Sequence, residues 1–232
     1  METDEFNKFA DEYLEVHAKN IKISGDDPEY FARYKIEAVR RYWNTAAKPD
    51  PIAIVDFGCG IGASLPHLNR VFPAATLTGI DVSRRSLDIA ANRFSGAAQL
   101  VLYKGDGALP LNSASADLVF SACVFHHIPA SMHVHLLTEL HRVLKPGGVA
   151  IVFEHNPANP VTRYIVATCP FDENAVLIAP RVLKQRLRQA GFSSARARYT
   201  GFFPGALSNL RGWEPWLELL PFGAQYYAVA HA

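Results

Sequence analysis

From residue 50 onward, short apolar runs alternate along the chain with segments in which apolar residues recur every three or four positions. Short apolar runs are typical of buried strands, and the longer spacing is typical of amphipathic helices. The predicted strands are Ile52 to Phe57, Thr76 to Ile80, Gln99 to Tyr103, Asp117 to Val124, Val149 to Phe153, Ala195 to Thr200 and Gln225 to Ala230. Helices are predicted between most of them, over residues 64–72, 84–94, 131–144 and 180–190.

Near-continuous apolar strands separated by helices predict βαβ units, and hence a mainly parallel α/β sheet with helices on both faces. Such a sheet binds its ligands at the carboxyl ends of its strands. The last two predicted strands lack a comparable helix between them, because residues 201–221 are rich in glycine, proline and aromatic residues. The N-terminal 45 residues predict two helices ahead of this core, and the second begins at Asp27-Pro28, an N-cap followed by proline.

Composition narrows the class of protein. The 232 residues include 23 Lys and Arg against 22 Asp and Glu, so no global field draws the protein onto a nucleic acid. Three widely spaced cysteines without a C-x-x-C pair argue against a disulfide framework and a zinc ribbon. The first residues are acidic, and no apolar run reaches the roughly 20 residues of a membrane span. We therefore expect a cytoplasmic protein without nucleic-acid partners or stable membrane insertion; its oligomeric state is left open.

The glycine-rich segment after the first predicted strand is the most informative. Gly58, Gly60 and Gly62 let the backbone approach a ligand closely, and the following helix presents unpaired N–H groups. Gly58-x-Gly60-x-x-Ala63 also fits a loose dinucleotide fingerprint, which keeps an NAD-dependent oxidoreductase and a non-catalytic cofactor-binding protein as alternatives. Asp56 argues otherwise, because a carboxylate beside this loop repels a pyrophosphate but accepts a hydrogen bond from an ammonium group. The sequence therefore favours an amino-acid-like cofactor without a phosphate.

Further motifs follow in order along the chain. They are Gly79-Ile80-Asp81-Val82-Ser83, Lys104-Gly105-Asp106-Gly107, the run from Asp117 through Ser121 to His126-His127-Ile128, and Leu144-Lys145-Pro146-Gly147-Gly148. With the glycine loop, these motifs resemble those of the class I S-adenosylmethionine-dependent methyltransferases over residues 5–232. The resemblance implies a Rossmann-like three-layer sandwich with a mainly parallel seven-stranded sheet, an antiparallel last strand and S-adenosyl-L-methionine as the cofactor.

The resemblance also divides the chain. Residues 1–45 are expected to form a helical N-terminal lid over the cofactor. Residues 46–232 are expected to form the S-adenosylmethionine-binding core, with acceptor-site insertions near residues 155–179 and 201–221.

Roles for single residues follow from the same resemblance. Asp81 pairs with the ribose hydroxyls, Val82 flanks the adenine, and Asp106 receives the adenine amino group. The predicted cofactor-binding set is Tyr13, Asp56, Gly58, Cys59, Gly60, Asp81, Val82, Asp106, Gly107, Ser121 and His126. In this set Tyr13 closes over the cofactor, and Cys59 is a small side chain packed beneath it rather than a nucleophile.

The five histidines between residues 126 and 141 raise the question of a metal site. His133, His135 and His141 fall on a predicted helix without the i, i+4 spacing of a ligand pair, so no metal site is predicted. His126 and His127 follow a strand end instead, where the resemblance places them near the methionine part of the cofactor.

Glu154 and His155 begin a polar stretch after the fifth predicted strand. His155 is the predicted general base, because neutral imidazole accepts a hydroxyl proton near neutral pH. Glu154 is expected to orient His155 or to bind a donor on the acceptor, and His127 is a second catalytic candidate.

The predicted function is methyl transfer to a small-molecule acceptor, most simply a hydroxyl oxygen in sugar, polyketide or other secondary metabolism. No RNA- or DNA-binding module accompanies the core in the sequence. A lipid or quinone-like acceptor is the alternative, which the aromatic residues of the 201–221 connector would suit.

Overall fold

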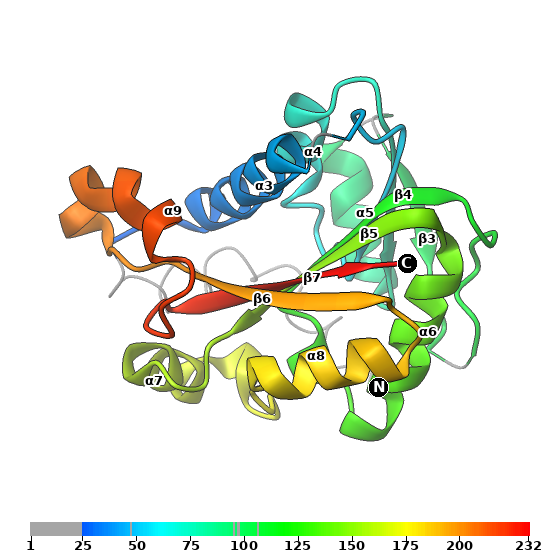
Figure 1. Ribbon diagram of the computed structural model, residues 1–232. Helices are drawn as coiled ribbons and strands as arrows, with labels where there is room; N and C mark the ends of the chain where they lie inside the picture. Colours follow the sequence, from blue (N-terminus) through cyan, green and yellow to red (C-terminus); the bar gives the residue numbers. More distant parts are fainter. Residues whose placement is uncertain (1–24, 47, 95, 97, 106) are drawn as a thin grey trace.

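The computed structural model describes residues 25–46, 48–94, 96, 98–105 and 107–232. In this part of the chain, a seven-stranded sheet has the strand order β3-β2-β1-β4-β5-β7-β6 (Figure 1). The strands are β1 (Ala53–Phe57), β2 (Thr76–Asp81), β3 (Gln99–Leu102), β4 (Ala116–Ala122), β5 (Leu144–His155), β6 (Ser194–Thr200) and β7 (Gln225–His231). Each overlaps one predicted strand.

The α-helices are α3 (Pro28–Thr45), α4 (Leu65–Val71), α5 (Arg84–Arg93), α6 (His133–Val143), α7 (Pro160–Thr168), α8 (Pro180–Gln189) and α9 (Glu214–Leu217). Short 3-10 helices are η2 (Phe125–His127), η3 (Ala130–Met132), η4 (Pro170–Asp172) and η5 (Gly205–Trp213). None of the helices in the described residues combines the length and the apolar character needed to cross a bilayer.

Strand direction agrees with the predicted sheet. β1 pairs in parallel with β2 and β4, and the pairs β2–β3 and β4–β5 are also parallel. β7 lies between β5 and β6 and runs antiparallel to both. The carboxyl ends of β1, β2, β4 and β5 therefore meet at one edge, and the loops that follow them surround one space.

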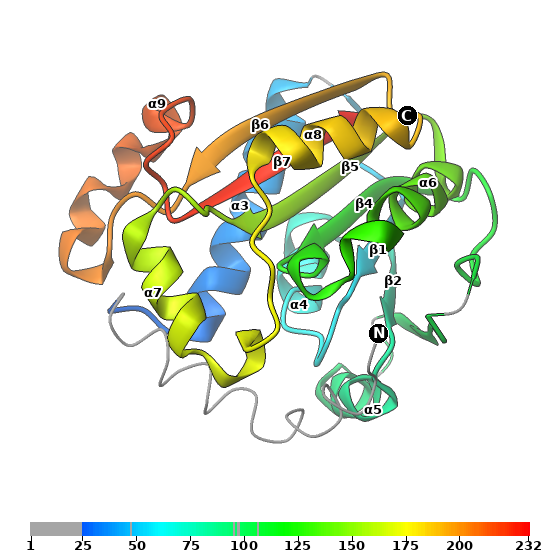
Figure 2. The same cartoon turned by 90° about the horizontal axis from the view of Figure 1, so that it is seen from below.

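Two apolar clusters cover the two faces of the sheet. On one face, Ile36 of α3 and Phe72 at the end of α4 pack in a cluster with Phe120 of β4. On the other face, Leu137 of α6 and Leu187 of α8 pack in a cluster that includes sheet residues such as Val119. Figure 1 shows the sheet between these helix pairs, and Figure 2 shows α6 and α8 from below. The molecule is thus the three-layer, Rossmann-like sandwich expected from the motifs.

Side-chain caps mark where α3 and α7 begin. Asp27 accepts a hydrogen bond from the backbone N–H of Tyr30 over 2.6 Å, and Pro28 occupies the first turn of α3. The same device starts α7, where Asn159 accepts from the N–H of Thr162 over 3.0 Å. The apolar pattern did not predict α7, nor the helices η5 and α9 in the 201–221 connector. The first predicted N-terminal helix lies outside the described residues.

Candidate functional site

A cavity of about 1050 Å³ opens at the carboxyl edge of the sheet. Its lining is mostly apolar and comes from the N-terminal part of α3, the loops after β1, β2 and β4, and α7. Nine of the predicted site residues line it: Asp56, Gly58, Cys59, Gly60, Asp81, Val82, His126, His127 and His155. Residues from three separate motifs, together with His155 from the polar stretch after the fifth predicted strand, therefore face one space.

The glycine loop after β1 is held against β2. The N–H groups of Gly58 and Cys59 donate to the carbonyl oxygen of Ile80, over 2.8 and 3.1 Å. Gly58 has a φ of 73°, and a Cβ there would lie 2.3 Å from Cγ2 of Val124. A Cβ on Gly60, by contrast, would meet no heavy atom within 4 Å. Packing against Val124 therefore requires glycine at position 58, whereas the lack of a side chain at Gly60 keeps space open toward the cavity.

Asp56 lies at the end of β1 with its side chain buried. Its Oδ2 atom has no hydrogen-bond partner among the described residues. Burial, with the negative charge of Asp81 adding to it, raises the pKa of Asp56 to about 8. A buried carboxyl oxygen without a donor is costly, and a ligand ammonium group would supply that donor and favour the ionised form.

Asp81 ends β2 and is fixed by backbone donors. Its Oδ2 accepts from the N–H of Gly60 and its Oδ1 from the N–H of Ser83, each over 2.8 Å. Burial raises the pKa of Asp81, although these hydrogen bonds oppose the shift. The carboxylate thus ties the glycine loop to β2, and each oxygen keeps a further lone pair for a ligand.

Four predicted cofactor residues are not placed in the cavity wall. Ser121 is buried inside β4, and Gly107 accepts a hydrogen bond from the Tyr103 hydroxyl at its carbonyl oxygen. Neither residue is among those that line the cavity. Tyr13 and Asp106 lie outside the described residues.

Cys59 is buried within the glycine loop, close to Gly79, where an added Cβ would lie 2.9 Å from the Cys59 sulfur. Burial, together with the nearby carboxylates of Asp56 and Asp81, raises the pKa of this thiol. A thiol that resists ionisation is a poor nucleophile, so this environment suits a packed side chain.

Glu154 and His126 form a buried pair beside the cavity. Nδ1 of His126 lies 2.6 Å from Oε2 of Glu154, and the other oxygen of Glu154 accepts from the N–H of Phe125 over 2.8 Å. Burial alone would lower the pKa of His126, but the carboxylates of Glu154 and Asp172 raise it to about 10. Glu154 was expected to orient His155 or to bind the acceptor. The structure joins it to His126 instead, because successive residues of β5 point to opposite faces.

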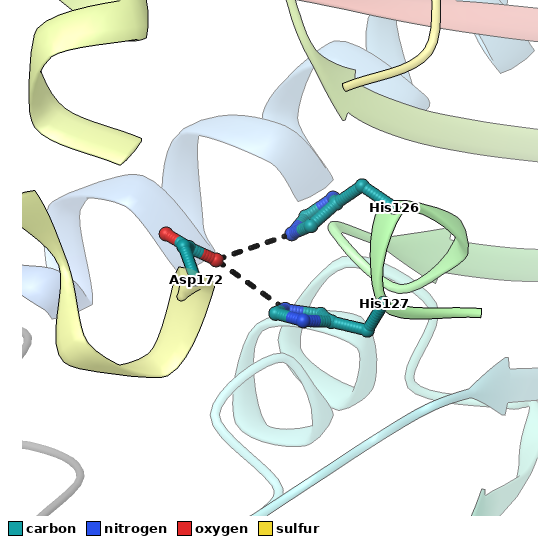
Figure 3. Close-up of side chains that lie close together, drawn as sticks. All are labelled: His126, His127 and Asp172. Carbon is teal, nitrogen blue, oxygen red and sulfur yellow. Dashed lines mark ion pairs between the residues drawn. The ribbon is translucent and has the colours of Figure 1, made fainter. Parts of the chain in front are cut away.

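His127 and Asp172 complete this group. The Nε2 atoms of His126 and His127 each lie 3.4 Å from Oδ1 of Asp172 (Figure 3). Burial and the charge on His126 lower the pKa of His127 to about 4. Burial favours the neutral form of Asp172, yet its contact with His126 and the charges of the nearby histidines lower its pKa to about 2. Asp172 is 45 residues away from His127 in the chain, and no local sequence signal connects the two.

His155 lies beside Cys123, a residue that the sequence did not single out. Cys123 follows β4 with a φ of 59°, a left-handed conformation that is uncommon for cysteine. Burial opposes ionisation of its thiol, but the positive charge of Lys35 and the charge and hydrogen bond of His155 lower its pKa to about 7. Lys35 comes from α3 and lines the cavity. Nothing in the amphipathic pattern of this helix indicated that Lys35 belongs to the site.

The other side of the cavity has an apolar wall. Val161 and Ile165 of α7 lie on this wall, with Phe202 and Phe203 from the loop after β6. Gln225 of β7 adds a polar group, because its Oε1 atom is buried without a hydrogen-bond partner among the described residues. The cavity therefore combines a charged end, beside β1 and β2, with an apolar end that carries a few polar atoms.

Comparison with known families gives one match within the chain. Residues 55–152, from β1 to β5, match the family described as "Methyltransferase domain". This segment contains the glycine loop, Asp81 and the His126-His127 pair.

Two curated relatives illustrate the similarity in sequence. A trans-aconitate 2-methyltransferase from Azoarcus sp. is 33% identical over 146 residues, which cover 62% of this chain and 56% of the relative. A fatty-acid O-methyltransferase from Mycolicibacterium smegmatis is 34% identical over 158 residues, 66% of this chain and 53% of the relative. The chain thus spans about half the length of these curated relatives.

Solved structures share the fold. A SAM-dependent methyltransferase from Thermotoga maritima superposes with a TM-score of 0.68 at 20% identity, covering 98% of both chains. A phosphoethanolamine N-methyltransferase from Haemonchus contortus, solved with S-adenosyl-L-methionine, gives a TM-score of 0.65 at 15% identity and covers 97% of this chain and 59% of that one. At these identities the likeness concerns the fold.

Proposed function

We propose that this protein, which carries a domain of the class I S-adenosylmethionine-dependent methyltransferase family, transfers a methyl group to an oxygen atom of a small-molecule acceptor. S-adenosyl-L-methionine, the cofactor of the family, supplies a methyl group already activated on a sulfonium sulfur. The match of residues 55–152 to a methyltransferase domain argues against the NAD-dependent oxidoreductase. The observation that carries the proposal is the unpartnered Oδ2 of Asp56 at the charged end of the cavity.

The residues present fit this cofactor. The carboxyl group of Asp56 suits an ammonium group, and Gly58, Cys59 and Gly60 leave backbone close to the cavity. Asp81 keeps lone pairs for the ribose hydroxyls, and Val82 lines the wall where an adenine would pack. We retain Asp106, Gly107, Ser121, Tyr13 and His126 as proposed contacts.

The chain's own contribution is positioning and exclusion of water. α7 and the loop after β6 form the acceptor end of the cavity with apolar side chains, and the N-terminal part of α3, which belongs to the proposed lid, also lines the cavity. Holding an acceptor oxygen in line with the methyl carbon supplies much of the catalytic effect, because the reacting atoms are then preorganised. Exclusion of water by this apolar wall also protects the activated methyl donor from hydrolysis.

His155 is the proposed general base. It ends β5 at the cavity wall, with its ring centroid 5.1 Å from that of His126. A neutral imidazole there accepts the proton that an acceptor hydroxyl loses as its oxygen is methylated. His127, on the same wall, is the second proposed catalytic histidine.

For the acceptor we propose a small molecule of biosynthetic metabolism, such as a sugar or polyketide hydroxyl, since a cavity of about 1050 Å³ has room beside the cofactor for a ligand of that size. A lipid-like acceptor is the second candidate. It is favoured by the mostly apolar cavity wall and by the fatty-acid O-methyltransferase among the relatives. Trp213, Trp216 and Phe222 add exposed apolar surface on the segment after β6.

Two measurements test the proposal. Calorimetry is expected to give micromolar binding of S-adenosylhomocysteine and none of NAD, and binding of NAD alone would overturn the function. Metabolite and lipid extracts incubated with methyl-labelled cofactor, followed by mass spectrometry, identify the methylated product. A labelled product carrying the methyl group on nitrogen or carbon would overturn the oxygen assignment.

A further inference from the structure

Three side chains on the cavity wall point toward one place. His126 and His127 come from η2, and Asp172 comes from η4 (Figure 3). One nitrogen of each imidazole and one carboxylate oxygen of Asp172 all lie within 4.8 Å of one another. All three residues line the cavity, and their side chains expose at most 17% of their surface.

The spacing is poor for direct hydrogen bonds and good for coordination. Both Nε2 atoms lie 3.4 Å from the same Oδ1 of Asp172, whereas a charge-assisted N–H···O bond has a length of about 2.7–2.9 Å. Ligand atoms bound tetrahedrally to zinc at about 2.0–2.1 Å lie about 3.3 Å from each other. The two nitrogen–oxygen distances of 3.4 Å therefore already match the spacing of ligand atoms around one ion.

The carboxylate of Glu154 is held in place next to His126. Oε2 of Glu154 lies 2.6 Å from Nδ1 of His126, on the side of the ring away from Asp172, and Glu154 is fully buried. The N–H of Phe125 holds the other oxygen of Glu154. Metal-binding histidines commonly donate their second ring nitrogen to such a carboxylate, which orients the ring and leaves Nε2 for the metal.

We propose that His126, His127 and Asp172 bind one divalent transition-metal ion, with Glu154 as the residue that positions His126. Two imidazoles and one carboxylate suit zinc, cobalt or iron, whereas magnesium and calcium prefer oxygen ligands. Three protein ligands would leave at least one coordination position open, and all three residues line the cavity. The ion would there take an oxygen atom of a ligand; this last role rests on the proposed function, but binding of the ion does not.

The experiment uses the full chain after treatment with a chelator. Titration with zinc is followed by calorimetry, and titration with cobalt by visible absorption. We expect one equivalent of either ion to bind, and the cobalt spectrum to report nitrogen and oxygen ligands. His127→Ala and Asp172→Asn are each expected to abolish this stoichiometric binding, and Glu154→Gln to weaken it about 10- to 100-fold. His135→Ala, which alters an exposed histidine of α6, is the matched control and is expected to bind normally.

Binding of S-adenosylhomocysteine and thermal unfolding are measured on the same samples, so that a misfolded variant is recognised. Absence of stoichiometric zinc and cobalt binding, or equal binding by Asp172→Asn, His127→Ala and the parent chain, overturns the metal site. If the parent chain binds S-adenosylhomocysteine but no metal ion, the metal site is excluded and the proposed function stands. If the parent chain binds the metal ion but not S-adenosylhomocysteine, the proposed function fails and the metal site stands.

Discussion

The backbone N–H of Gly60 donates to Oδ2 of Asp81 over 2.8 Å. This hydrogen bond joins the glycine loop to the end of β2, so that the two segments proposed to hold the cofactor form one unit. A carboxylate that already accepts two backbone donors is also fixed in place for a third donor from a ligand.

Loss of this charge is expected to weaken cofactor binding. Asp81→Asn keeps the shape of the side chain but removes a charge-assisted acceptor, and the affinity for S-adenosylhomocysteine should fall about 10- to 100-fold. Calorimetry gives the affinity. Asp88→Asn, which removes an exposed carboxylate from α5, is the control. Equal affinities of the two variants would contradict the role of Asp81.

Asp56→Asn is expected to make the ligand-free protein more stable. At neutral pH the folded chain keeps a proton on Asp56, whose pKa is about 8, whereas the unfolded chain has released it. The free energy of unfolding contributed by this group therefore decreases as the pH rises from about 4 toward 8. Asparagine removes that dependence and should raise the melting temperature at pH 8 by at least about 2 °C. An unchanged or lower melting temperature would show that the buried carboxyl group is not destabilising.

Binding of S-adenosylhomocysteine is expected to depend on pH through the same residue. An ammonium group prefers the ionised carboxylate, so affinity should increase by up to about tenfold per pH unit between pH 6 and 8, with release of a proton. Asp56→Asn should bind more weakly and with a flatter pH profile. Calorimetry in buffers of different ionisation enthalpy measures the proton release. A parent protein with no pH dependence would refute the pairing of Asp56 with the ammonium group.

Gly58→Ala is expected to destabilise the fold by about 2–4 kcal/mol, because the new Cβ would lie 2.3 Å from Cγ2 of Val124 in a residue with a φ of 73°. Gly105→Ala is a matched control, since Gly105 has a φ of 77° but open space around an added Cβ. Denaturant unfolding measures the stability of both variants. The double variant Gly58→Ala/Val124→Ala should recover part of the loss. If Gly58→Ala is no less stable than Gly105→Ala, packing against Val124 is not the constraint.

His155→Ala is expected to lower kcat about 100-fold with the acceptor found in the extract screen, while the affinity for S-adenosylhomocysteine changes less than about twofold. This split follows from the position of His155 on the cavity wall, outside the glycine loop and the strand ends that hold Asp56 and Asp81. Steady-state kinetics and calorimetry measure the two quantities, with His135→Ala as control. A variant that turns over normally would exclude His155 as the base.

The strands and the helices of the sandwich were predictable because each has its own periodic pattern of apolar residues. The prediction for α6, residues 131–144, differs from the observed His133–Val143 only at its ends. The pattern missed α7, although Asn159-Pro160 is a cap followed by proline, because prolines and asparagines dominate the preceding residues. Helices of this length depend on packing more than on local preference.

The residues of the candidate site were predictable only where a recognisable sequence motif contains them. Asp56 and Asp81 end neighbouring parallel strands, so their sequence positions alone imply that they lie close together. The convergence of Asp172 with His126 and His127 depends instead on the path of the chain after β5 through α7 and η4. The helical histidines lack the spacing of a ligand pair, and the carboxylate that joins His126 and His127 lies 45 residues beyond His127 in the sequence.

The place of β7 in the sheet has a consequence for how the molecule is made. Among the strands in the described residues, β6 pairs with β7 alone, and β7 separates it from β5. During synthesis on the ribosome, β1 to β5 emerge first and can pair with one another, but β6 has no neighbour until residues 225–231 emerge. Gln225 and Ala224 belong to the cavity wall, so the wall is also completed late. We therefore expect nascent chains that end before residue 225 to have a folded five-stranded sheet of β1 to β5, an unpaired β6 and an open cavity, and to require chaperone protection at that stage.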